Sequence, residues 1–438
     1  MIQSIVVALL VLGLIIVIHE FGHFAVAKLF KIKVETFSVG FGPRLIGFRR
    51  GETDYRISAL PLGGYVKMSG ENPGDVITGD ASEFMSKPKW QRFLVAAAGP
   101  FMNIVLAFVL IAGLFMYGMD MPEFVQAGTA IVGLVTPNSP ADKAGVRKND
   151  HVVEIEGKAK PNWNNILLQI GTNPERPLSV VLERDGQRIP TTITPTLDKR
   201  TGTGDSGMGP LIRVIVKEVQ PGRPAAAAGI RPNDEIISVA GIDPRMNGKP
   251  LSDTIQTIEE KTFPITVLRE GKSIELQVSP VIDGNRKLIG ILQGYATTFV
   301  KLGFMDSMSE SVRMNGENAK LIFQILGRLV KREASVKQLD GPIGIVRASG
   351  EAASVGLAAL ITLTAMISLN LGLVNLLPIP ILDGGVMLLL LIETLMGRDL
   401  SLNIKERIVQ VSMVFLLLMM AVVLYNDVVK LLPVSIAP

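Results

Sequence analysis

Two histidines and a glutamate stand at metal-site spacing in the most apolar part of the N-terminal sequence. His19, Glu20 and His23 follow a run from Ile5 to Ile18 in which every residue is apolar. Residues four apart share one face of a helix, so both imidazoles point the same way. In this H-E-x-x-H arrangement the histidines hold zinc and the glutamate is the general base of a metalloprotease. An ionisable group at mid-bilayer costs about 2.5–3.5 kcal/mol, which favours a functional role over hydrogen-bonded core histidines.

A catalytic zinc ion of this kind takes three protein ligands, so one more is required. Asp383 follows a second strongly apolar run, in the sequence NLLPIPILDGG. The first and third predicted spans run in the same direction, so their C-terminal ends emerge on one face. His19 lies about 25 Å along its helix in a core about 30 Å thick, and Asp383 can reach the same depth. The alternative role of Asp383 is that of a turn residue at a helix end.

Four apolar segments predict a polytopic α-helical membrane protein. The sequence is 48% hydrophobic and its mean hydropathy is +0.38. Cysteine is absent, so metal ligands must be nitrogen or oxygen atoms. The net charge is only +4 and no Lys/Arg-rich tract occurs, so nothing indicates a nucleic-acid partner. The predicted transmembrane helices comprise residues 1–29, 93–119, 355–384 and 405–430.

The segment between the first two spans, residues 30–92, predicts the orientation in the bilayer. It contains 10 lysines and arginines, whereas none precedes Lys28. The positive-inside bias makes it cytoplasmic, which places both termini outside and the zinc site near the cytoplasmic side. Short β-like runs and Gly-rich turns within it predict a membrane-associated β-hairpin beside the first helix. An ordinary surface hairpin is the alternative.

The segment between the second and third spans contains an internal repeat. Pro137, Pro140, Gly145 and Asp150 recur in the same order, each 84 residues later. We therefore predict two extracytoplasmic copies of one domain, residues 126–200 and 208–285. Each copy resembles a PDZ domain, which takes an extended peptide along a sheet edge, with a rigid spacer as the alternative. His151, the third histidine, is expected to be a surface residue with no metal role.

Residues 305–350 follow the repeats and show amphipathic helical periodicity. Apolar residues such as Leu321, Ile322 and Ile325 share one side of the predicted helix, and charges are scattered elsewhere. This pattern predicts a helix on the membrane surface, and packing on the protein's own spans is the alternative.

Taken together, these motifs resemble the site-2 protease family of intramembrane zinc metalloproteases. The resemblance covers essentially the whole chain. It rests on H-E-x-x-H, the turn Gly40-Phe41-Gly42-Pro43, the block Ala98-Gly99-Pro100-Phe101-Met102-Asn103, the two PDZ-like copies, the segment Gly341-Pro342-Ile343-Gly344-Ile345 and the N-x-x-P-x-P-x-L-D-G segment that starts at Asn375.

The resemblance implies one zinc ion per chain, held by His19, His23 and Asp383, with Glu20 as the catalytic base. It also implies substrate contacts at Asn375 and Asn370, and a hairpin that guides substrate as an added strand along the edge formed by Tyr65, Val66 and Lys67. The implied substrates are single-pass membrane proteins, such as anti-sigma factors already trimmed outside, in a bacterial inner membrane.

Two other classes of function stay open from the sequence alone. A non-enzymatic membrane scaffold would use the PDZ-like pair to bind envelope proteins, and metal analysis would separate it from a protease. A transporter is suggested by the broken helices and intramembrane charges, although four spans without an inverted repeat argue against it.

Overall fold

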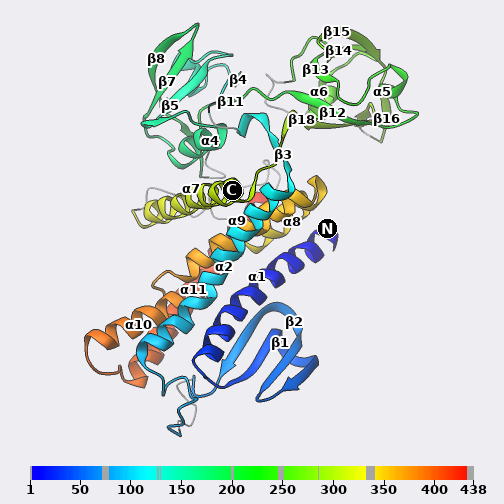
Figure 1. Ribbon diagram of the computed structural model, residues 1–438. Helices are drawn as coiled ribbons and strands as arrows, with labels where there is room; N and C mark the ends of the chain where they lie inside the picture. The colour runs from blue at the N-terminus through cyan, green and yellow to red at the C-terminus, as the bar shows by residue number, and fades with distance from the viewer. Residues whose placement is uncertain are drawn as a thin grey trace. The chain divides into compact units, whose positions relative to one another are not determined.

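The computed structural model describes residues 2–71, 78–125, 128, 130–198, 202–244, 251–284, 286–331 and 341–431 (Figure 1). The chain divides into two compact units. The first unit comprises Met1–Met119 with Lys301–Pro438 and contains the long apolar helices. The second comprises Asp120–Val300 and is built mainly from β-strands.

Four helices of the described chain are long and apolar enough to cross a membrane, which confirms the prediction of a polytopic membrane protein. Apolar side chains cover these helices on most sides, as expected where lipid replaces water. The first two helices pack side by side in the first unit. The four are α1 (Ile2–Leu29), α2 (Lys89–Tyr117), α9 (Leu357–Asn375) and α11 (Leu402–Leu431).

The third predicted span, residues 355–384, is divided in the structure. Helix α9 ends at Asn375, and a separate helix α10 (Asp383–Leu395) begins at Asp383. Pro378 and Pro380 lack the amide hydrogens that a continuous helix needs. A Cβ on Gly384 would collide with the backbone of the preceding turn, so glycine allows the turn to fold over the start of α10. Asp383 therefore lies on the first turn of a helix rather than at the end of a span.

The segment predicted to be cytoplasmic, between the first two spans, forms two long antiparallel strands, β1 (Val34–Arg50) and β2 (Thr53–Met68). Both strands bend back on themselves: Thr36 of β1 pairs with Lys67 on one side and with Asp54 on the other, and Asp54 of β2 pairs with both Thr36 and Arg49. The end of β2 is therefore an edge of this small sheet, and β2 lies against α1 (Figure 1). The far end of β1 is exposed throughout.

The amphipathic region contains helix α7 (Phe304–Val330) and helix α8 (Pro342–Val355). The Ser311 hydroxyl donates to the Phe108 carbonyl oxygen at 2.8 Å, so α7 packs against α2. This contact corresponds to packing on the protein's own spans, the second of the two alternatives. Residues 332–340 lie outside the described residues.

The second unit contains two β-domains in sequence, each with its own buried core. Trp163 is the largest fully buried side chain of the first core, and Phe263 that of the second. The first sheet has the order β6 (Lys158–Ala159), β5 (His151–Ile155), β7 (Leu178–Arg184), β8 (Gln187–Ile193), and the second has the order β15 (Lys272–Val278), β14 (Phe263–Arg269), β13 (Glu235–Val239), β12 (Val214–Val219), β18 (Ile291–Tyr295).

Strand β18 extends the second domain beyond the predicted boundary at residue 285. It forms one edge of the five-stranded sheet by pairing with β12. Two short strands, β3 (Met119–Pro122) and β19 (Thr297–Val300), pair with each other where the chain enters and leaves the unit.

An ion pair recurs at equivalent places in the two domains. Arg184 donates from Nε and Nη2 to the carboxylate of Asp150, both at 2.7 Å, and Arg269 does the same to Asp234. Each aspartate side chain is only 1% exposed. The aspartates are the 84-residue pair found in the sequence. His151 interacts through Nε2 with the Gly128 carbonyl oxygen at 2.9 Å.

Candidate metal centre

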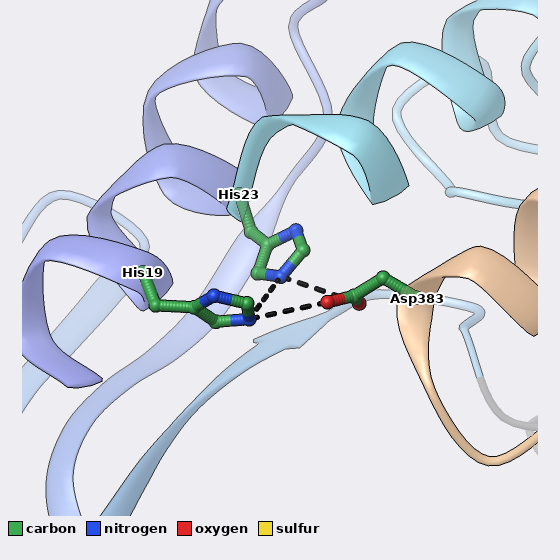
Figure 2. Close-up of side chains that lie close together, drawn as sticks. All are labelled: His19, His23 and Asp383. Atoms are coloured by element: carbon green, nitrogen blue, oxygen red, sulfur yellow. Dashed lines mark hydrogen bonds and ion pairs between the residues drawn. The ribbon is translucent and has the colours of Figure 1, made fainter. Parts of the chain in front are cut away.

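Three potential metal ligands converge in the first unit. His19 and His23 project from the same face of α1, and Asp383 projects toward them from the start of α10 (Figure 2). The two Nε2 atoms lie 3.2 Å apart. The Asp383 carboxylate lies 3.2 Å from Nε2 of His19 and 3.4 Å from Nε2 of His23. The predicted ligands, although far apart in sequence, therefore form one cluster.

This donor set fits zinc. Zinc bonds to histidine nitrogen and carboxylate oxygen are about 2.0–2.2 Å long, and tetrahedral geometry then separates neighbouring donors by about 3.3–3.6 Å. The three observed separations, 3.2 to 3.4 Å, are close to this range. Three protein donors leave a fourth tetrahedral position for water or substrate, as in catalytic rather than structural sites.

The second nitrogen of each imidazole is turned away from the cluster and has its own partner. His23 Nδ1 lies 2.8 Å from the Val95 carbonyl oxygen, and a carbonyl can only accept. Nδ1 of His23 therefore carries the hydrogen, and its Nε2 lone pair faces the cluster. His19 Nδ1 lies 3.2 Å from the side-chain amide of Asn103 on α2. Such partners fix the orientation of metal-binding histidines.

Two glycines allow α1 and α2 to approach closely at this level. A Cβ on Gly22 would lie 2.7 Å from the Ala98 carbonyl carbon and 2.9 Å from Met102 Cγ. A Cβ on Gly99 would lie 2.8 Å from His19 Nε2 and 2.7 Å from His23 Cε1. Neither space can hold a side chain. Gly99, the glycine of the Ala98–Asn103 block, therefore leaves the space that the imidazoles of His19 and His23 occupy.

A cavity of about 420 Å³ opens beside the three ligands. Glu20 lines it, as do Tyr65 and Val66 from the edge of the small sheet. The general base predicted from the sequence and the predicted substrate strand therefore face the same space.

Three predicted site residues are not among the described residues that line this cavity. Lys67 forms an ion pair with Glu35 at 2.8 Å. Asn370 and Asn375 lie on the last turns of α9. Gly372, between them, packs against α2, where a Cβ would lie 3.3 Å from Asn103 Cβ. Their predicted substrate contacts stay predictions.

The cavity also contains charged residues that the sequence analysis did not identify. Arg92 is 5% exposed and Glu393 is 1% exposed, and both line the cavity wall. Glu393 pairs with Lys405 of α11 at 2.6 Å. The signal of Arg92 in the sequence is weak, because lysines and arginines are also common at the cytoplasmic ends of spans.

Comparison with known proteins agrees with this geometry. The sequence profile of peptidase family M50 matches residues 7–419. The chain belongs to peptidase family M50. It is 30% identical to the regulator of sigma E protease of Haemophilus influenzae over 445 residues, covering 97% of this chain and 98% of that protein. It is also 30% identical to the regulator of sigma-E protease RseP of Escherichia coli, covering 95% and 96%.

A third relative names the metal. The chain is 31% identical to a putative zinc metalloprotease of Ralstonia nicotianae over 456 residues, covering 96% of this chain and 97% of that protein. The family and these full-length similarities confirm the resemblance to site-2 proteases. The chain is a zinc metalloprotease, and zinc is its cofactor.

Proposed function

We propose that this protease cleaves peptide bonds within the transmembrane segments of single-pass membrane proteins. The observation that carries the proposal is that His19 and His23, on the candidate membrane span α1, converge with Asp383 at tetrahedral donor spacing. A soluble protease would have no reason to place such a cluster on a membrane span, given the cost of burying ionisable groups there.

Each residue of the site has a distinct role in the proposed hydrolysis. His19, His23 and Asp383 would hold the zinc ion, which would supply Lewis acidity at the scissile carbonyl. Glu20 takes the proton from the attacking water and passes it to the departing nitrogen. An amide donor from Asn375 stabilises the negative charge on the carbonyl oxygen, a role worth roughly 3–4 kcal/mol where such donors have been removed.

The edge of the small sheet presents the substrate. A transmembrane helix keeps its carbonyl groups in internal hydrogen bonds, so it must unwind locally before cleavage. Pairing with the strand of Tyr65, Val66 and Lys67 compensates the backbone groups that unwinding frees. Tyr65 and Val66 of this strand line the cavity, which supports the assignment.

The relatives suggest the kind of substrate. Their names describe proteases that regulate sigma E, which points to anti-sigma-like single-pass proteins as substrates of this chain as well. We propose that it acts in the bacterial inner membrane, in regulated intramembrane proteolysis during envelope stress, on substrates already trimmed by another protease. The lysines and arginines of residues 30–92 support a cytoplasmic position for the hairpin.

We further propose that the two β-domains are PDZ domains on the periplasmic side, together with both termini. The strand and helix order and the recurring Asp150–Arg184 and Asp234–Arg269 pairs support two copies of one domain. Domains of about 85 residues, roughly 25–30 Å across, are large enough to exclude proteins with bulky external domains. Filtering of this kind is the role we favour over delivery of trimmed substrates.

A deletion separates filtering from delivery. Because β3 and β19 already pair, removing residues 123–296 and joining the two strands by a short turn preserves the connection. Filtering predicts that the shortened protein cleaves untrimmed substrates. Intact substrates that stay uncleaved while trimmed ones are cut more slowly would instead support delivery.

The proteolytic assignment itself is tested by Glu20→Gln. Zinc content and cleavage of a model transmembrane peptide are measured for the variant and the wild type in the same detergent. The variant should keep its zinc and lose cleavage, because the ligands remain and proton transfer fails. Substantial residual turnover would rule out Glu20 as the base.

A further inference from the structure

Asn103 lies behind the metal cluster, where it contacts a ligand without lining the cavity. It is fully buried on α2, at 0% exposure. Its side-chain nitrogen Nδ2 is placed 3.2 Å from His19 Nδ1. Its Oδ1 atom has no hydrogen-bond partner among the described residues.

The amide can face His19 in two ways, with opposite chemical results. With its nitrogen toward Nδ1, Asn103 donates, so His19 must carry its hydrogen on Nε2 and cannot bind metal. With its oxygen toward Nδ1, Asn103 accepts, so the hydrogen lies on Nδ1 and the Nε2 lone pair is free. Rotation of the amide by 180° exchanges the two states without moving its neighbours.

We propose that Asn103 is a positioning residue that selects the metal-binding tautomer of His19 by accepting a hydrogen bond from Nδ1. The inference rests on the proposed function, since it takes His19 as a zinc ligand. It gives His19 the arrangement that the Val95 carbonyl gives His23. Metal-binding histidines generally donate their second nitrogen to an acceptor of this kind.

The backbone of Asn103 is held independently of its side chain. Ser368 of α9 donates from its hydroxyl to the Asn103 carbonyl oxygen at 2.7 Å. This bond fixes α9 against α2 and is unaffected by changes to the Asn103 amide. Ser368→Ala is therefore a matched control: it removes the hydrogen bond to the Asn103 backbone and leaves the contact between the Asn103 side chain and His19 in place.

The test measures zinc affinity by chelator competition in the full-length protein. Asn103→Leu, which removes the acceptor, should bind zinc 10–100-fold more weakly. Asn103→Asp, whose carboxylate accepts from Nδ1, should bind within a few-fold of the wild type. Ser368→Ala should also bind like the wild type. The absorption spectrum of the cobalt-substituted protein should change in Asn103→Leu and not in Ser368→Ala.

These measurements separate a role of the Asn103 side chain in orienting His19 from a role in packing α2 against its neighbours. Undiminished zinc affinity in Asn103→Leu would overturn the proposal, as would an equal loss in Asn103→Asp or in Ser368→Ala. Asn103→Asp keeps the test valid even if the leucine variant does not fold. His19→Ala, measured alongside, separates the two claims: unchanged zinc binding there would overturn the proposed ligand set itself.

Discussion

Replacing Gly99 with alanine should damage the metal centre directly, although the residue bears no functional group. The added Cβ would lie 2.8 Å from His19 Nε2 and 2.7 Å from His23 Cε1. Ordinary van der Waals contact begins at 3.4 Å, so each imidazole must move by about 0.6 Å or more. Functional sites tolerate displacements of only about 0.5 Å.

The size of the effect follows from the cost of overpacking. An extra methyl group in a well-packed site costs about 1–3 kcal/mol. If the cost falls on the zinc-bound arrangement, zinc affinity should decrease by roughly 5–150-fold. Proteolysis at limiting zinc should fall with it.

The assay compares Gly99→Ala with Gly113→Ala by chelator competition. Gly113 lies on the same helix, and a Cβ there would meet nothing within 4 Å. The control should bind zinc like the wild type, so the comparison removes general effects of alanine in α2. Equal zinc affinity in both variants would refute the reasoning about the close approach of α2 to the ligands.

Three further predictions address the ligands, the edge strand and the β-domains. Asp383→Ala should lower zinc occupancy as well as cleavage, because two protein ligands remain; unchanged zinc content would place the third ligand elsewhere. Val66→Pro should slow cleavage of helical substrates more than of extended ones, because proline lacks the amide hydrogen, and equal slowing of both would exclude strand addition. Burial alone would raise the pKa of Asp234, but hydrogen bonds from Arg269 and from the Arg231 amide together hold that pKa below its ordinary value. Its ionised form therefore stabilises the fold above about pH 3.9, and this contribution is lost as the pH falls further. Asp234→Asn should lower the melting temperature at pH 7 and weaken its decrease in acid; an unchanged melting temperature would contradict this.

The sequence predicted the membrane-spanning helices because each has a long apolar run. The break in the helix before Asp383 could not be predicted from the sequence, since Pro378 and Pro380 can either kink a helix or end it. The structure shows that α9 ends at Asn375 and that α10 begins at Asp383. The curvature of β1 and β2 was also missed, because it depends on Thr36 pairing on both sides.

The sequence predicted those site residues that lie close together in the chain or belong to a known motif. His19, Glu20 and His23 are four residues apart at most, and a helix alone brings them together. The roles of Gly99 and Asn103 depend on how α2 packs against α1, and the spacing of residues in the sequence does not predict this packing. The substrate contacts of Asn370 and Asn375 stay predictions.

The most direct test of the account is the position of zinc in the folded protein. Anomalous scattering at the zinc absorption edge, from crystals of the full-length protein, locates the ion without reference to activity. We expect one zinc per chain, about 2.0–2.2 Å from Nε2 of His19, Nε2 of His23 and a carboxylate oxygen of Asp383. Zinc bound elsewhere, or bound without Asp383, would contradict it.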